Sequence, residues 1–196
     1  MPDELAHRAA LVFGVERPAG RNAAVALAEA GANVALVTLS EDTAAEFAAN
    51  STANEFWAIG RKSIVLTTDG GETTFREAIA DASTDLGPIS ILVYHARAPM
   101  PPAALAGLRS DPAIIVIIDG EDVAASRELL AWARTLADAG LRANALVTSR
   151  ASADAIGPAL KEHKPPQPLD VKRAMVYLAS DVTAAVEGAL LVAEVA

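Results

Sequence analysis

A turn near the start of the chain, bounded by two glycines, has the residue types of a phosphate-binding loop. Gly14 and Gly20 enclose Val15-Glu16-Arg17-Pro18-Ala19, between an apolar run and an alanine-rich stretch. A turn of this kind opens a helix and directs free backbone N–H groups at the pyrophosphate of a dinucleotide. Pro18 stands where close approach of the phosphates calls for glycine, and its ring removes an N–H donor. Because proline opens helices well, the sequence predicts an intact helix start and a weakened anion site.

A second group of reactive residues lies at or just after predicted strand ends. His95 and Asp119 end two apolar runs, and Arg127 lies on the helix predicted next. Carboxyl ends of neighbouring parallel strands meet at the edge where ligands bind. A His–Asp pair can carry out acid–base work. The favoured interpretation is an Asp119–Arg127 ion pair beside a vacated pocket, and Asp119 can instead cap the helix. His7, His95 and His163 are too scattered in the sequence to predict a metal site.

Apolar runs alternate with alanine-rich stretches, which predicts strand–helix–strand units and a parallel sheet covered on both faces. The predicted strands are Ala10–Gly14, Asn33–Leu39, Ser63–Asp69, Ile89–His95, Ala113–Asp119, Leu141–Thr148 and Ala189–Val195. The predicted helices are Gly20–Ala30, Glu41–Asn50, Thr73–Leu86, Glu121–Ala139 and Val171–Ser180. Two proline-rich stretches, Pro99–Pro102 and Pro165–Pro168, are predicted to be loops or lids. Since no linker or internal repeat stands out, residues 1–196 are predicted to form one domain.

The composition sets further bounds on the class of protein. The chain has 196 residues, 52% of them hydrophobic, with a mean hydropathy of +0.29, which is enough for a sizeable core. Its net charge of −9 argues against nucleic-acid and anionic-membrane partners. The absence of cysteine excludes disulfides and thiolate catalysis. The stretch MPDELAHRAA has no signal-peptide pattern, and no apolar run approaches the roughly 18 residues of a membrane span. We therefore expect a cytoplasmic protein.

Several stretches, in a fixed order, resemble the short-chain dehydrogenase/reductase (SDR) family over nearly the whole chain. They are Phe13-Gly14-Val15-Glu16-Arg17-Pro18-Ala19-Gly20, Tyr94-His95-Ala96-Arg97, Leu141-Arg142-Ala143-Asn144-Ala145-Leu146, Tyr177-Leu178-Ala179-Ser180-Asp181 and Gly188-Ala189-Leu190-Leu191-Val192. The resemblance implies a Rossmann-like three-layer α/β sandwich, with a parallel sheet of about seven strands in the order 3-2-1-4-5-6-7.

The resemblance also implies roles for the residues of a cofactor site. Arg17 stands where NADP-preferring members carry an arginine beside the 2′-phosphate, and Thr38 where NAD-preferring members carry an acidic residue. Asp69 falls on the family's aspartate near the adenine amino group. Together with Gly14 and Gly20 they form a vestigial cofactor-binding set. From the residues alone, Arg17 can equally be an exposed arginine on a turn, and Asp69 a backbone cap.

The catalytic Ser-Tyr-Lys residues of the family are missing. Asp119 stands at the serine position, Val123 at the tyrosine position and Arg127 at the lysine position. Valine has no proton to give to a developing alkoxide, and arginine stays protonated across accessible pH. Only about sixteen residues separate Arg97 from Ile114. The segment before the fifth strand is therefore shortened relative to the family.

These departures predict a truncated and degenerate SDR homologue without catalysis of its own. We expect a structural or regulatory subunit of a hetero-oligomeric dehydrogenase, paired with an intact SDR subunit or with a second copy of itself. No cofactor is expected, although NADP binding stays open. Two alternatives remain: an NADP(H)-dependent oxidoreductase with rearranged catalytic groups, and a non-catalytic ligand-binding module.

Overall fold

One parallel β-sheet runs through the whole molecule in the computed structural model, which describes residues 3–108, 112–157, 160–165, 169–183 and 185–193. Its strands follow the order β3-β2-β1-β4-β5-β6-β8-β7. The strands are β1 (Ala9–Phe13), β2 (Asn33–Thr38), β3 (Ser63–Thr67), β4 (Ile89–Tyr94), β5 (Ala113–Ile118), β6 (Ala143–Val147), β7 (Lys161–Glu162) and β8 (Ala189–Val192). This confirms the Rossmann-like α/β fold and the expected order of seven strands. The two-residue β7, which the sequence did not predict, adds an eighth strand beside β8.

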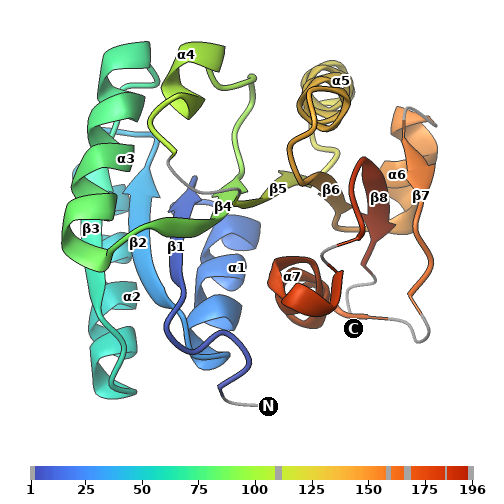
Figure 1. The fold of residues 1–196 in the computed structure, drawn as a ribbon. Helices are drawn as coiled ribbons and strands as arrows, with labels where there is room; N and C mark the ends of the chain where they lie inside the picture. The colour runs from blue at the N-terminus through green and yellow to red at the C-terminus, as the bar shows by residue number, and fades with distance from the viewer. Residues whose placement is uncertain (1–2, 109–111, 158–159, 166–168, 184, 194–196) are drawn as a thin grey trace.

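Helices cover both faces of the sheet. The helices are α1 (Pro18–Glu29), α2 (Thr43–Ala58), α3 (Glu72–Leu86), α4 (Pro102–Leu105), α5 (Val123–Asp138), α6 (Arg150–Ile156) and α7 (Val171–Ala179), with a short 3₁₀ turn, η1 (Asp181–Thr183). One buried cluster joins the sheet to α3, α4 and α5, and a second joins it to α1, α2 and α7. Figure 1 shows the first group of helices in the upper half and the second in the lower half.

Local hydrogen bonds explain where the helices begin and end. Asp170 caps α7 as predicted, accepting from the N–H of Arg173 at 2.8 Å. The cap of α5 is Asp122 and not Asp119, since its carboxylate accepts from Ala124 and Ala125. Helix α2 continues to Ala58, beyond its predicted end at Asn50, and the polar side chains in its middle bond back to carbonyls one turn earlier. The predicted loop Pro99–Pro102 leads into α4, a single turn. Pro165–Pro168 lies mostly outside the described residues.

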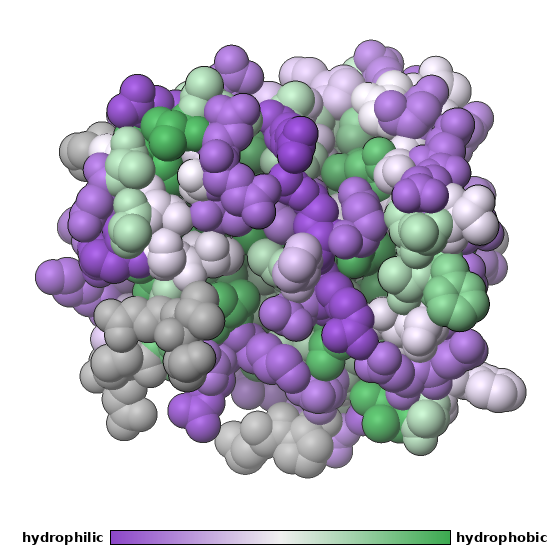
Figure 2. Space-filling view, turned by 180° about the vertical axis from the view of Figure 1, so that it is seen from behind, coloured by the Kyte–Doolittle hydropathy of each residue, from purple (hydrophilic) through white to green (hydrophobic). Residues whose placement is uncertain are grey.

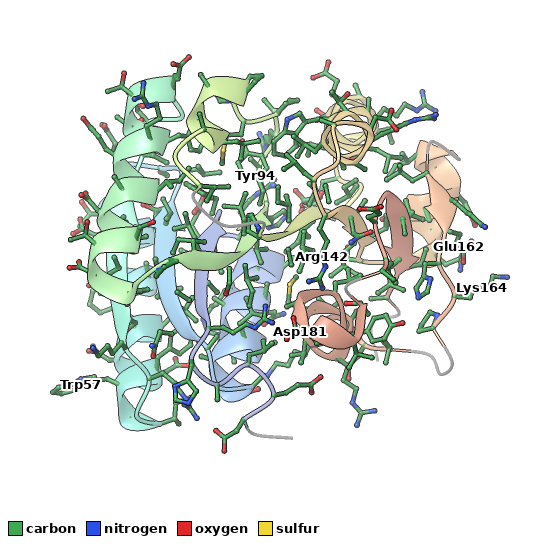
Figure 3. All side chains as sticks on the ribbon, in the orientation of Figure 1. Trp57, Tyr94, Arg142, Glu162, Lys164 and Asp181 are labelled. Atoms are coloured by element: carbon green, nitrogen blue, oxygen red, sulfur yellow. The ribbon has the colours of Figure 1, made fainter. Side chains whose placement is uncertain are left out.

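An aromatic cluster fixes the ends of β1 and β4. Phe13 meets Phe75 edge-to-face with ring centroids 5.2 Å apart, and Tyr94 meets Trp132 at 5.1 Å. Figure 3 places Tyr94 in the interior of the molecule, and its hydroxyl donates to the carbonyl of Ala98 at 2.8 Å. Burial raises the pKa of Tyr94. The residues that follow β1 and β4, Gly14 and His95, therefore start from rigidly packed strands.

The surface shows no broad apolar area on its rear side. Seen from behind, hydrophobic residues lie in small groups among hydrophilic ones (Figure 2). Within the described residues, no helix is both long and apolar enough to cross a membrane.

Candidate functional site

The turn between β1 and α1 packs directly against the end of β4. Gly14 has φ +80°, and a Cβ built there would lie 1.9 Å from the carbonyl oxygen of His95. A Cβ on Gly20 would lie 2.1 Å from the carbonyl oxygen of Gly14. No side chain fits at either position. Both glycines are therefore required for the turn to close onto β4, whether or not a ligand binds there.

His95 fills the N-terminus of α1. Its side chain is buried, and its Nδ1 accepts a hydrogen bond from the backbone N–H of Gly20 at 3.1 Å. A backbone N–H can only donate, so Nδ1 carries no proton and Nε2 carries the ring proton. That Nε2–H donates to Oδ2 of Asp119 at 3.0 Å. Burial lowers the pKa of His95, which agrees with a neutral ring.

Asp119 extends this network to the surface. Its Oδ2 lies 3.6 Å from Nη1 of Arg17, and its Oδ1 accepts from the N–H of Glu121 at 3.1 Å. Arg17 also lies 3.7 Å from the carboxylate of Glu121. Burial alone would raise the pKa of Asp119, but the His95 hydrogen bond and the other contacts lower it overall. We call the linked set Gly20, His95, Asp119 and Arg17 the His95 network.

The expected Asp119–Arg127 pairing is wrong, because another arginine lies beside Asp119. Arg127 donates from Nε to the carbonyl of Ile156 at 3.1 Å and from Nη2 to that of Ala155 at 3.3 Å. It therefore binds the C-terminal carbonyls of α6, a usual place for a cation. Val123 is the first residue of α5 and is 37% exposed. The side chains at the three catalytic positions thus do not converge on one point.

The remaining predicted cofactor residues serve local structure. Thr38 is fully buried and donates from its hydroxyl to that of Thr67 on the neighbouring strand at 3.1 Å. Asp69 accepts from Thr74 Oγ1 at 2.5 Å and from the N–H of Gly71 at 2.7 Å, ahead of α3. These two contacts hold the pKa of Asp69 below its ordinary value. The interpretation of Asp69 as a backbone cap is the one that the contacts support.

Glu16 is a residue of the site that the sequence did not single out. Its carboxylate accepts a hydrogen bond from the backbone N–H of Leu39, just after β2, at 3.2 Å. It thereby places a negative charge beside the end of β2, close to Thr38. The only signal in the sequence for a role of Glu16 was its position in the turn after Gly14. Because carboxylates are common in turns, that position alone did not distinguish it.

Two hollows open at the carboxyl edge of the sheet. The larger, about 690 Å³, extends from Glu16 and Leu39 past Asp69 to the residues after β4. The smaller, about 170 Å³, is lined by Asp119, Glu121 and the start of α5. Arg17, Ala96 and Arg97 line both hollows and so stand between them. Among the residues that the structure describes, no cluster of histidine and acidic side chains could hold a metal ion.

Comparison with known proteins supports the fold. No protein-family model and no curated protein matches the sequence. Among solved structures, a short-chain dehydrogenase from Burkholderia cenocepacia in complex with NADP gives a TM-score of 0.73 at 19% identity, covering 98% of each chain. A blue fluorescent protein from a metagenomic library, in complex with NADPH, gives 0.71 at 22% identity and 98% of each chain. A hydroxysteroid dehydrogenase from Escherichia coli gives 0.71 at 21% identity, covering 98% of this chain and 97% of that one. The chain therefore has the fold of the short-chain dehydrogenases.

Two of these structures contain NADPH or NADP, and two features at the N-terminus of α1 in this chain work against binding of a pyrophosphate. Pro18 has no N–H, and the N–H of Gly20 is already donated to His95. The guanidinium of Arg17 lies between the carboxylates of Asp119 and Glu121, which offset its charge. A pyrophosphate at this turn would find neither of these two N–H donors and would lie beside both carboxylates.

Proposed function

We propose that this chain is a non-catalytic protein with the short-chain dehydrogenase fold, acting as a structural or regulatory subunit beside an intact dehydrogenase. The occupied N-terminus of α1 carries this proposal. The N–H of Gly20, in the first turn of α1, is donated to the buried His95, and His95 in turn donates to the Asp119 carboxylate. This helix N–H is therefore not available to a phosphate. These hydrogen bonds of His95 stabilise the start of α1 without a bound cofactor.

The groups near the two hollows support the same proposal. Both ring nitrogens of His95 are engaged, and the ring is buried, so it has no free position from which to move a substrate proton. Tyr94 is buried with its hydroxyl bonded to a carbonyl. The smaller hollow has a volume of about 170 Å³, which is below the roughly 300 Å³ of the smallest usual small-molecule sites.

A capture experiment tests the subunit role. The tagged chain, purified from its native host, is expected to bring with it a dehydrogenase that keeps the serine, tyrosine and lysine, in a near-constant ratio. Adding the purified chain to that dehydrogenase is expected to change its turnover or its melting temperature. The proposal is wrong if the chain leaves both properties unchanged when present in excess.

A nucleotide-binding module is the second candidate, and the larger hollow supports it. Its volume of about 690 Å³ lies within the range of small-molecule sites. Two structures of the same fold were solved with NADPH and NADP. Glu16 disfavours a 2′-phosphate near Leu39, because its carboxylate already holds that backbone N–H. These residues permit a nucleotide that lacks the 2′-phosphate and that binds in the larger hollow away from α1.

A further inference from the structure

The strand β3 forms an open edge of the sheet. It pairs with β2 on one side and ends the strand order. The N–H of Val34 bonds the carbonyl of Lys62, and the N–H of Thr68 bonds the carbonyl of Thr38. Peptide groups alternate in direction along a strand, so the even-numbered residues of this segment face β2. The odd-numbered residues, Ser63, Val65 and Thr67, therefore direct both N–H and C=O away from the sheet.

Exposed apolar side chains gather beside this edge. Within the described residues, three of the five large hydrophobic side chains that stay exposed lie on α2 or just after it: Phe47 at 76%, Trp57 at 81% and Ile59 at 50%. Arg21 of α1 contacts Thr52 and Glu55, which marks the side of α2 that faces α1. Trp57 lies two residues, or about 200° of helical rotation, beyond Glu55. It therefore points away from α1, and Figure 3 shows it projecting outward from this end of the molecule.

We propose that two copies of this chain associate through their β3 edges, antiparallel, about a two-fold axis at Val65. In this register Val65 lies opposite Val65, and Ser63 lies opposite Thr67. All three outward-facing residues then meet outward-facing residues, so each pair can exchange N–H···O=C hydrogen bonds. The same patch serves both copies, as a closed two-fold interface requires. This inference does not depend on the proposed function.

The charges at the ends of β3 favour the antiparallel register. Arg61 and Lys62 precede the strand and Asp69 follows it. Around the axis, Arg61 lies opposite Asp69 of the second copy, and Lys62 lies opposite Thr68. Arg61 also forms an ion pair with Asp3 of its own chain at 3.0 Å, so Asp69 would add a second carboxylate beside it. A parallel arrangement in register would instead place like charges side by side, which is unfavourable. Charged residues at a strand edge disfavour pairing with other strands, and here they favour antiparallel pairing with a second copy of this chain.

The apolar side chains fit the same arrangement. An axis perpendicular to the sheet keeps both α2 helices on the same face of the joined sheet. The C-terminal end of each α2, which carries Trp57, then lies near the N-terminal end of the other. Tryptophan side chains commonly supply a large share of the binding energy at interfaces. A second copy would thus cover the side chain of Trp57, which is 81% exposed in the single chain.

Sedimentation over a range of protein concentrations tests this proposal. The wild-type chain is expected to reach twice its single-chain mass of 20.2 kDa. Trp57→Glu and Val65→Pro are each expected to weaken the dimer at least about tenfold, since one anchor or one pair of hydrogen bonds is lost. The side chain of Trp57 is exposed, and the N–H of Val65 faces away from β2, where a proline leaves the sheet pairing intact. Circular dichroism is therefore expected to stay that of a folded chain.

A matched control separates the β3 edge from general surface hydrophobicity. Val182 is 83% exposed on η1, and Val182→Glu is expected to leave the dimer unchanged. The proposal is overturned if the wild type stays a single chain at about 100 µM. It is also overturned if both edge variants dimerise like the wild type, or if Val182→Glu dissociates the dimer as strongly as they do. Pairing with a strand of another protein, without self-association, contradicts it as well.

Discussion

Replacing His95 with alanine is expected to lower the free energy of unfolding by about 3 kcal/mol. The change removes the acceptor for the Gly20 N–H and the donor for the Asp119 carboxylate, and it leaves a cavity under the turn. A buried donor without a partner costs more than the hydrogen bond contributed, because it has lost water as well. Urea denaturation near neutral pH, followed by circular dichroism, measures the loss.

Two variants serve as controls for His95→Ala. Asparagine at position 95 keeps an acceptor close to the place of Nδ1, so His95→Asn is expected to lose about half as much. His163→Ala removes a half-buried histidine that stacks on Tyr177, and a loss of about 1 kcal/mol or less is expected. If His95→Ala loses no more than His163→Ala, the His95 network does not stabilise the turn.

The same contacts give the stability a pH dependence. The pKa of His95 in the folded protein lies below its ordinary value of 6.5, so between the two values the unfolded chain binds more protons. This contribution is complete above pH 6.5 and is lost as the pH falls toward the folded value. Asp119, whose pKa lies below 3.8, adds a contribution that is lost only at lower pH. His95→Asn is expected to flatten the pH dependence between neutral pH and mildly acid pH.

Gly14→Ala is expected to destabilise the fold by about 4 kcal/mol or more, enough to unfold many domains. A Cβ at this position would lie 1.9 Å from the carbonyl oxygen of His95, and the obstacle is backbone held by β4. Neither the turn nor the strand can move without breaking the sheet pairing of β1 with β4. The yield of soluble protein and the urea midpoint measure the effect.

Gly140→Ala and Gly60→Ala are the matched controls for this substitution. Their φ angles, +82° and +74°, resemble that of Gly14, but a Cβ at either position meets nothing within 4 Å. Each is expected to cost about 1 kcal/mol, the strain of the left-handed conformation alone. Equal losses at all three glycines would mean that the contact with His95 carries no extra cost.

The sequence predicted the fold well because burial sets the strand pattern. The inner strands are apolar at nearly every position, so their existence and order followed from composition and resemblance. Helix ends were predicted less well: α2 runs to Ala58, past Asn50, because its polar side chains bond back to the helix rather than end it. The two-residue β7 has no pattern long enough to detect.

The site was predictable only in part. His95 and Asp119 were predicted to lie at one edge of the sheet, because strand ends meet there, and the structure brings them within hydrogen-bond distance. The choice between Arg17 and Arg127 as the partner of Asp119 depended on side-chain directions that a turn and a helix set in three dimensions. Capping of α1 by a histidine 75 residues away is likewise invisible to spacing along the chain.

Calorimetric titration of the wild-type chain with NADPH tests the central claim most directly. With the Gly20 N–H donated to His95 and no N–H at Pro18, no saturable binding at α1 is expected up to about 1 mM ligand, the level at which a weak site would fill. Saturable binding at micromolar concentrations would show that the turn accepts the pyrophosphate. Asp119→Asn is then expected to strengthen that binding, because it removes a carboxylate beside Arg17. Saturable binding would contradict the claim that His95 and Pro18 leave the N-terminus of α1 without these two donors for a pyrophosphate.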